Sequence, residues 1–491
     1  MTDGIAIALS LISHTNAGKT TLARTLLGRD VGEVRDAPHV TTESSSFLLV
    51  ESPAGDSLTL WDTPGFGDSV RLVRRLRQLD NPVGWFLSQV WDRYRDRPFW
   101  LTQQAVRTVH ERSDVVLYLV NAAEEPADAG YLAPELEVLE WIGKPVLVLL
   151  NQTGPPREPA EEAAEEDRWR TALGSAGHVL GVLTLDAFAR CWVQEFTLFA
   201  AVGGVLPEEK AAALARLEAA WRARRMAQFD EAMAALAGPI ARAARDRVTL
   251  PPDPLALRLA RSLGLVKVLG TRAEAEATRA MGARLREDLQ VSSGRLIATY
   301  ELEGSAADVV MQRVENDVRR EGPLDEGKAA VMGGLVSGAV SGLAADLAAG
   351  GLTFGAGMLA GAALGALGAA GLARGVNVVR GTTDQSLRWE DAFLDGLVTA
   401  ALLRYLAVAH YGRGRGQWKE GEYPPFWRER VLQRVVAHEP ELAALWRLRS
   451  ADIAGERLER ELRDVLSGMA LALLDELYPG ALSRDAAAAP R

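Results

Sequence analysis

The sequence predicts an α/β domain with a mostly parallel six-stranded sheet in residues 1–204, followed by an all-α region containing a glycine-rich helical hairpin. Three observations support this division. Short apolar runs alternate with helical segments in the first part, which indicates parallel strands covered by helices on both faces. From residue 207 onward, apolar residues recur at helical spacing instead. An almost uncharged stretch rich in glycine and alanine then occupies residues 331–373.

Length and composition limit the classes of protein that fit. A chain of 491 residues suggests about three domains. The net charge of −10 lacks the basic excess of nucleic-acid binders, so we do not expect a nucleic-acid partner. Cys191 is the only cysteine, which excludes an intramolecular disulfide, and we expect it to be a small core residue. No basic segment precedes the first strand, so we expect no signal peptide.

The first strand, expected over 5–12, leads into the segment S-H-T-N-A-G-K-T-T, which starts at Ser13. A helical segment over 22–27 follows, and Gly28 would end it. A strand, a glycine-containing loop and a helix in this order are typical of a phosphate-binding loop. In such a loop the backbone N–H groups cradle phosphate, the lysine reaches the β- and γ-phosphates, and the hydroxyl binds Mg²⁺. The candidate binding residues are Asn16, Ala17, Gly18, Lys19, Thr20 and Thr21.

One departure from the phosphate-loop pattern is that Ser13 occupies the position of its first glycine.

A second motif follows a predicted hairpin of two strands over 46–50 and 57–61. The tetrad D-T-P-G runs from Asp62 to Gly65, about 40 residues after the phosphate loop. A carboxylate there can hold the magnesium shell, and the glycine N–H can sense the γ-phosphate. A threonine of the preceding loop can close on both, and we favour Thr42 over Thr41. The candidate catalytic residues are therefore Lys19, Thr42 and Gly65, and Thr20, Thr42 and Asp62 are candidate magnesium ligands.

Three further apolar strands complete the predicted sheet, over 115–120, 145–150 and 178–183, with helices around 133–142 and 160–175 between them. The strand over 145–150 leads into the tetrad N-Q-T-G. Asn151 and Gln152 are therefore the candidate residues for binding the nucleotide base.

These motifs resemble GTPases of the Era and TrmE type in the first 200 residues. The resemblance rests on T-N-A-G-K-T, the paired threonines, D-T-P-G and the asparagine at the base position. The chain as a whole is similar to a bacterial GTPase family whose C-terminal half is known only as a domain of unknown function. The resemblance implies GTP and GDP as ligands and Mg²⁺ as cofactor. It also leaves a homodimer through the GTPase domain open.

Two positions refine the resemblance. Phe66 stands where Ras-like enzymes carry a water-orienting glutamine, as in GTPases with a hydrophobic substitution, which need another group or ion for catalysis. Asn16 matches the asparagine that helps bind K⁺ in TrmE-like members. A role for Asn16 in stabilising the loop is equally compatible with the sequence.

The sequence departs from the family pattern in the segment that recognises the nucleotide base. The family pattern N-K-x-D ends in an aspartate that pairs with guanine, but here Gly154 supplies no acceptor. Loss of such a hydrogen bond typically costs about 1–3 kcal/mol. Guanine specificity is then weaker than in the family or is met elsewhere, for instance by Asp186, and ATP stays an alternative.

The helical part begins with apolar residues at helical spacing, which predict a helix that ends at Gly238–Pro239. The sequence gives no strand signal over 207–325. The glycines of the later stretch at 331–373 form two ladders four residues apart, which allow helix backbones to approach closely in a hairpin. Its second arm, 352–373, would be about 33 Å long, enough to cross a bilayer core of about 30 Å. Burial of the hairpin within the helical domain is the competing interpretation.

The sequence therefore predicts a nucleotide-switch hydrolase joined to a membrane-associating helical module. Its place would be the cytoplasmic face of the bacterial inner membrane, with lipid as a partner, or the cytoplasm if the hairpin is buried in protein. The alternatives are a soluble ribosome- or RNA-associated GTPase and a nucleotide-binding switch with negligible turnover. The predicted domains are 1–204 (GTPase), 205–327 (helical), 328–381 (hairpin), 382–483 (C-terminal helical) and 484–491 (disordered tail).

Overall fold

The computed structural model describes residues 4–14, 17–28, 45–77, 96–154, 156–174, 176–187, 190–251, 272–302, 376–380, 385–411, 424–449 and 454–483. The chain divides into two compact units. The first comprises residues 1–227 with 409–418 and 474–491, and the second comprises 228–408 and 419–473.

The first unit is built on a six-stranded sheet with the strand order β2-β3-β1-β4-β5-β6. Strand β2 is antiparallel to β3, and the other neighbours are parallel. The predicted mostly parallel six-stranded sheet is therefore confirmed. The strands are β1 (Ala6–Ser13), β2 (Ser45–Glu51), β3 (Ser57–Asp62), β4 (Val115–Asn121), β5 (Val146–Asn151) and β6 (Val179–Thr184).

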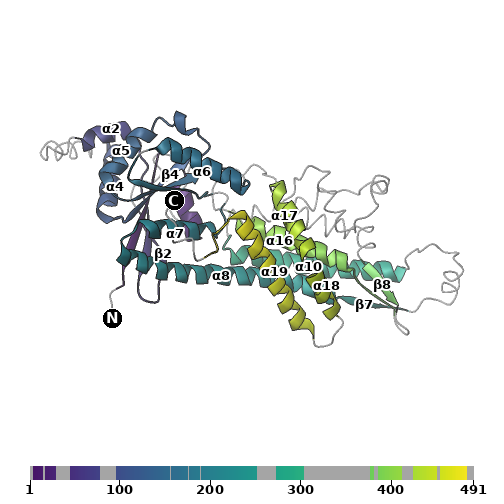
Figure 1. Ribbon diagram of the computed structural model, residues 1–491. Coiled ribbons are helices and arrows are strands. Elements are labelled where there is room, and N and C mark those ends of the chain that lie inside the picture. The colour runs from purple at the N-terminus through teal and green to yellow at the C-terminus, as the bar shows by residue number, and fades with distance from the viewer. Residues whose placement is uncertain are drawn as a thin grey trace. The chain divides into compact units, whose positions relative to one another are not determined.

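Helices cover both faces of this sheet (Figure 1). Helices α4, α5 and α6 lie on one face, whereas α7 and the first part of α8 lie on the other (Figure 1). The helices are α1 (Lys19–Leu27), α2 (Ser69–Leu76), α4 (Arg97–Arg112), α5 (Leu132–Ile142), α6 (Pro159–Leu173), α7 (Gln194–Val205) and α8 (Glu208–Arg245), with a 3₁₀ turn at Pro126–Asp128.

The core on the α4–α6 face contains Phe66, Tyr118 and Trp169, all at most 2% exposed. Burial of apolar side chains of this size is the main favourable term that holds helices to a sheet. On the other side, Cys191 is completely buried, and this burial raises the pKa of its thiol to about 12. The expectation that Cys191 is a core residue is confirmed.

Helix α8 contradicts the predicted helix end at Gly238–Pro239, because it continues through Pro239 to Arg245. Proline has no N–H to bond the carbonyl four residues earlier, which is that of Ala235. Ser292 Oγ donates a hydrogen bond of 2.7 Å to that carbonyl instead, so the interruption is compensated from another helix.

The second unit is mainly helical, as predicted, but it also contains a three-stranded sheet in the order β7-β9-β8. Strand β7 lies within 207–325, where no strand was predicted; it is only four residues long and pairs with residues 385–388, far along the chain. The elements are β7 (Arg247–Leu250), α10 (Arg272–Thr299), β8 (Val376–Arg380), β9 (Gln385–Trp389), α16 (Asp391–Ala409), α17 (Pro425–Ala437), α18 (Glu439–Leu448) and α19 (Ala454–Leu477).

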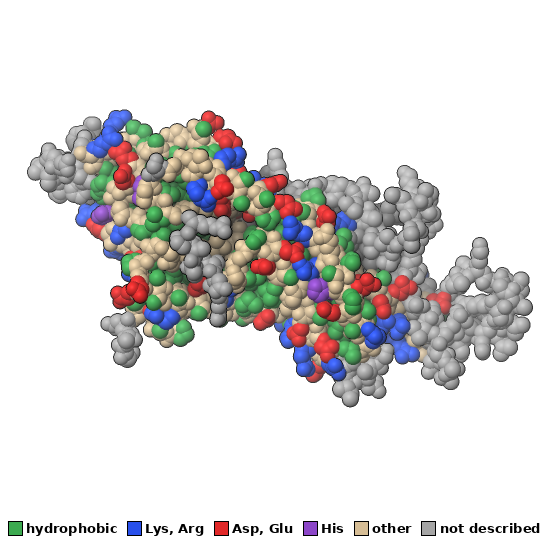
Figure 2. Space-filling model, in the orientation of Figure 1, with side chains coloured by type: hydrophobic (Ala, Val, Ile, Leu, Met, Phe, Trp, Pro, Cys, Tyr) green, Lys and Arg blue, Asp and Glu red, His purple; other side chains and the backbone are tan. Residues whose placement is uncertain are grey.

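The predicted membrane hairpin at 331–373 lies outside the described residues. Of the helices that the structure describes, α16 alone is long and apolar enough to cross a membrane, and 78% of its apolar window is buried within the protein. Its Arg404 is 6% exposed and donates a 2.7 Å hydrogen bond to Ser293 Oγ of α10. Such contacts are those of a core helix. Figure 2 shows that, on the face drawn, acidic and basic side chains of the described residues are interspersed.

Candidate nucleotide-binding site

The phosphate loop joins the end of β1 to the start of α1, as predicted. Gly18 precedes the helix with φ of 91°, a left-handed conformation that glycine adopts without strain. A Cβ atom at this position would lie 2.6 Å from the side-chain nitrogen of Asn151. Gly18 therefore allows the loop to approach the base-recognition segment.

Lys19, Thr20 and Asp62 come together at the ends of parallel strands β1 and β3. Thr20 Oγ1 donates a hydrogen bond of 2.6 Å to Asp62 Oδ2, and both side chains are buried. Lys19 Nζ donates to Ser13 Oγ at 2.8 Å, so the serine that replaces the first glycine contacts the lysine directly. Burial lowers the pKa of Lys19, and the carboxylates of Asp62 and Glu135 oppose this shift.

The Asp62 carboxylate has a second oxygen with unmet bonding capacity. Its Oδ1 atom is buried without a hydrogen-bond partner among the described residues, and burial raises the pKa of the group. A buried carboxylate oxygen beside a threonine hydroxyl is an oxygen donor set that suits Mg²⁺, which usually takes one or two protein ligands plus phosphates and water. The residues that are described therefore fit the predicted magnesium site.

The segment after Asp62 is hydrogen-bonded to the phosphate loop. The N–H of Phe66 donates to the Ser13 carbonyl oxygen at 2.9 Å, which holds the neighbouring Gly65 beside the loop. The Phe66 side chain lies in the hydrophobic core, 2% exposed, and not in solvent. This burial agrees with the prediction that residue 66 provides no side chain to orient water.

Asn151 connects three loops. Its side-chain nitrogen donates to the Ala17 carbonyl oxygen at 2.6 Å, and its oxygen accepts from the Ala187 N–H at 2.8 Å. Asn151 is completely buried. The base-recognition segment is thus joined to the phosphate loop and to the loop after β6.

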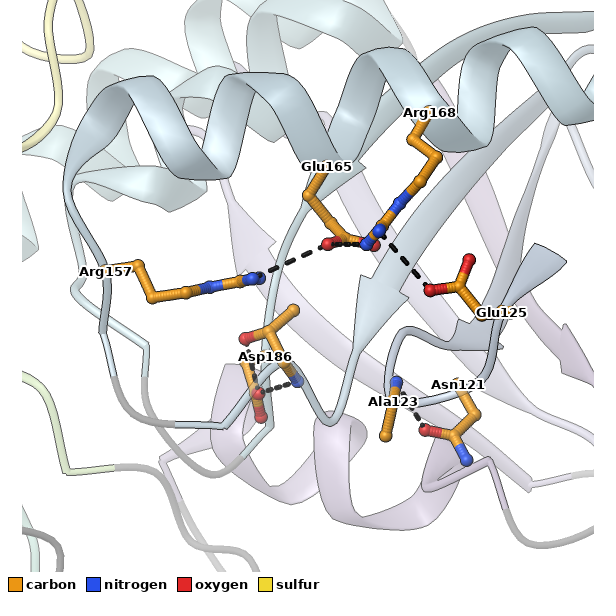
Figure 3. A network of polar contacts seen from close by, with 8 residues as sticks. Asn121, Ala123, Glu125, Arg157, Glu165, Arg168 and Asp186 are labelled. Atoms are coloured by element: carbon orange, nitrogen blue, oxygen red, sulfur yellow. Dashed lines mark hydrogen bonds and ion pairs between the residues drawn. The ribbon is translucent and has the colours of Figure 1, made fainter.

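Asp186 supports this segment from the end of β6. Its Oδ2 atom accepts hydrogen bonds from the Thr153 N–H at 2.7 Å and the Thr153 hydroxyl at 2.9 Å (Figure 3). Asp186 was predicted from the sequence as a substitute acceptor for guanine, whereas Thr153 was not predicted to take part in the site. The polar side chain at Thr153, two residues after the asparagine, was the only available signal. Figure 3 also shows a chain of ion pairs in which Glu165 and Arg168 of α6 link Arg157, before this helix, to Glu125, after β4.

The remaining predicted residues divide into two groups. Thr21 lies buried in the first turn of α1, and Gln152 adopts a left-handed φ of 61° beside Asn151. Asn16 and Thr42, the proposed potassium ligand and the threonine that would close on Mg²⁺, lie outside the described residues.

Two family models match the chain. The model described as 50S ribosome-binding GTPase matches residues 9–152, which include Lys19, Asp62 and Asn151. The first unit therefore contains a P-loop GTPase domain, as predicted. A second model, described as a domain of unknown function (DUF3482), matches residues 177–461, more than half of the chain. The protein belongs to the DUF3482 family.

No curated protein matches the chain. A crystal structure of Era with MgGDPNP and a segment of 16S ribosomal RNA is 17% identical, with a TM-score of 0.31. The match covers 42% of this chain and 58% of that one. An Era variant from Aquifex aeolicus bound to GDP·AlF4⁻ is 13% identical, with a TM-score of 0.30, over 59% and 90% of the two chains. A dimerization-deficient variant of Toc33 from Arabidopsis thaliana is 14% identical, with a TM-score of 0.26, over 38% and 72%. The GTPase class follows from the family model and the site, not from these structures.

Proposed function

We propose that this protein is a magnesium-dependent GTP hydrolase whose nucleotide state controls a membrane-associating module in its C-terminal half. The main support for the hydrolase activity is that the buried side chains of Lys19 and Thr20, at the start of α1, lie together with that of Asp62. A buried ammonium group and a buried carboxylate oxygen without a described partner are compensated together by a phosphate and a divalent cation.

Each residue then has one task. Lys19 binds the β- and γ-phosphate oxygens, and the backbone N–H groups at the N-terminus of α1 cradle them. Thr20 and Asp62 hold Mg²⁺, which would neutralise charge that develops on the phosphates. The Gly65 N–H senses the γ-phosphate, so loss of that phosphate releases the segment after Asp62. Thr42 is proposed to close on the same phosphate.

Water activation needs a group other than Phe66, because its side chain is buried in the core. We propose that a cation bound by Asn16 activates the water, and K⁺ is the candidate. The competing function is a binding switch with negligible turnover, and hydrolysis that responds to K⁺ distinguishes the two.

Guanine is the proposed base. Asn151 is fixed by Ala17 and Ala187, which pre-orders an amide at the base position. Because Gly154 offers no carboxylate, we expect modest discrimination against adenine.

The membrane component rests on the sequence of 331–373, and the proposed location is the cytoplasmic face of the bacterial inner membrane. A ribosomal partner is the second candidate, since the matching family model carries the description of a 50S ribosome-binding GTPase. Liposome flotation and ribosome co-sedimentation of the full-length protein distinguish these partners. A homodimer through the GTPase domain stays a prediction, and sedimentation of the GTP-bound protein tests it.

Nucleotide competition tests the proposed hydrolase. Unlabelled GTP, ATP and XTP would compete with a labelled GTP analogue for the full-length protein. We expect GTP to compete at least roughly tenfold better than ATP, which corresponds to about 1.4 kcal/mol. Lys19→Ala should abolish binding, whereas Lys144→Ala, in the turn before β5, should not. Equal competition by ATP would contradict guanine specificity.

Phosphate release in KCl and in NaCl tests the ion. We expect faster release in KCl, and equal rates would contradict a potassium site. Release no faster than that of Lys19→Ala in either salt would favour the binding switch.

A further inference from the structure

A buried carboxylate lies directly behind the phosphate loop. Glu135 of α5 is completely buried, and its Oε1 atom lies 2.6 Å from His14 Nδ1. The hydroxyl of Tyr118, on β4, donates to Oε2 at 2.6 Å. Taking a carboxylate out of water is costly unless hydrogen bonds compensate it. Glu135 therefore depends on both partners, of which Tyr118 lies in β4 and His14 directly follows β1.

His14 is fixed on its other sides as well. Its ring stacks on Tyr131, with 4.5 Å between the ring centroids and 17° between the planes. Its backbone pairs with Phe66 in an isolated parallel bridge. The residue before it, Ser13, accepts hydrogen bonds from the Phe66 N–H and from Lys19 Nζ. Movement of His14 would therefore disturb both the lysine and the segment that follows Asp62.

Helix α5 also holds the helix that follows this segment. Arg77, which ends α2, donates to both carboxylate oxygens of Glu137, at 2.7 and 2.8 Å. Glu135 and Glu137 thus connect one helix to the phosphate loop and to α2.

We infer that Glu135 is a positioning residue of the nucleotide site: it holds His14, and through it Ser13 and Phe66, in the arrangement that receives phosphate. The inference rests on the proposed nucleotide binding. Glu135 touches no phosphate in this role and acts through the loop backbone. The contrasting explanation is a hydrogen bond that only stabilises the core.

A pair of substitutions separates these explanations. The double variant Glu135→Leu/Tyr118→Phe replaces the polar pair by apolar groups of similar size, a change that is often neutral or stabilising for folding. We expect its melting temperature to equal or exceed that of the wild type. Its Kd for labelled GTP should nevertheless rise at least roughly tenfold, because small misplacements of binding groups are costly.

The conservative variant Glu135→Gln retains an acceptor for His14, and its Kd should stay within about threefold of the wild type by the same geometric argument. Glu140→Gln is the matched control, since Glu140 is an exposed carboxylate on the same helix. Its Kd should not change.

His14→Ala removes the contact from the other end and keeps the test valid if the double variant does not fold. It should weaken binding as much as Glu135→Leu, and the combination should add little, since the two residues act as one unit. Wild-type affinity in the folded double variant, or full additivity in the cycle, would overturn the inference. Wild-type protein that binds no nucleotide, or binds it independently of Lys19, would instead overturn the proposed function.

Discussion

The hydroxyl of Ser292 replaces a backbone donor that Pro239 lacks, by bonding the carbonyl oxygen of Ala235 at 2.7 Å. Ser292 is 3% exposed, and the contact joins α10 to α8 within the second unit. An unsatisfied buried carbonyl costs about 1–3 kcal/mol, so this one hydroxyl makes a proline inside a long helix tolerable.

The effect of removing that hydroxyl should therefore depend on residue 239. Ser292→Ala alone should destabilise the protein by about 1–3 kcal/mol, because the Ala235 carbonyl loses its donor. In a Pro239→Ala background the restored N–H can bond that carbonyl, so the same substitution should cost much less. Chemical denaturation of the four proteins of this cycle provides the measurement. If Ser292→Ala lowers the free energy of unfolding equally in both backgrounds, the Ser292 hydroxyl does not compensate for the missing N–H of Pro239.

A carboxylate at residue 154 should restore guanine discrimination. Gly154 is exposed with φ of 85°, and a Cβ atom there would meet no atom within 4 Å. Aspartate tolerates left-handed φ better than most residues do. Gly154→Asp should raise the preference for GTP over ATP by about 10- to 100-fold, the range expected for a regained buried hydrogen bond. Gly154→Ala carries the same backbone strain without the carboxylate. If the two variants discriminate equally, guanine is recognised in another way.

Glu162 should make stability depend on pH. It lines a cavity of about 320 Å³ between α6, β6, α7 and residues 477–481. The pKa of its carboxyl is raised to about 7: burial is the main cause, Arg157 opposes the shift, and the charges of Glu166 and Asp186 add to it. The group ionises near pH 4.5 in the unfolded chain but only near pH 7 in the folded one. Between these values the folded state holds more protons, so stability falls as pH rises.

Glu162→Gln should remove that loss. Relative to the wild type, the variant should gain stability between about pH 4.5 and 7 and keep the gain above pH 7. The gain should not exceed about 3.5 kcal/mol, because the pKa values of the folded and unfolded states differ by about 2.5 and each tenfold change in an equilibrium constant is worth about 1.4 kcal/mol. Melting temperatures at pH 4.5 and pH 8 test this, with Glu161→Gln, an exposed neighbour, as control. A variant whose offset from the wild type is the same at both pH values would contradict the expectation.

Deletion of 331–373 tests the membrane module. In lipid a helical hairpin satisfies its own backbone hydrogen bonds, so the intact protein should stay with membranes after an alkaline carbonate wash. The deletion variant should become soluble and still bind nucleotide through Lys19. Gly338→Leu with Gly361→Leu should loosen the helix seam but leave the protein in the membrane fraction. Full-length protein that is monodisperse in detergent-free buffer would end the membrane hypothesis.

Local patterns predicted most of the GTPase domain. Lys19, Thr20 and Asp62 belong to short motifs next to strongly apolar strands. Each motif and the strand that positions it lie within a few residues of one another, so both can be recognised locally. The partners of Glu135 and Asp186 could not be predicted in the same way, because His14 and Thr153 approach them only after distant segments have packed. The sheet of the second unit was missed for a related reason. Its strands are four or five residues long, and β7 is stabilised by pairing with a segment more than a hundred residues away.

The burial of Cys191 gives the molecule a built-in reporter. It is the only cysteine in the chain, it is completely inaccessible, and its thiol is held in the unreactive protonated form. The thiolate is the form that attacks thiol reagents, so native protein should resist them until the surrounding elements open. The rate of modification at this one atom then measures how often the GTPase domain opens, and repeating it with bound nucleotide measures how far the ligand suppresses that opening.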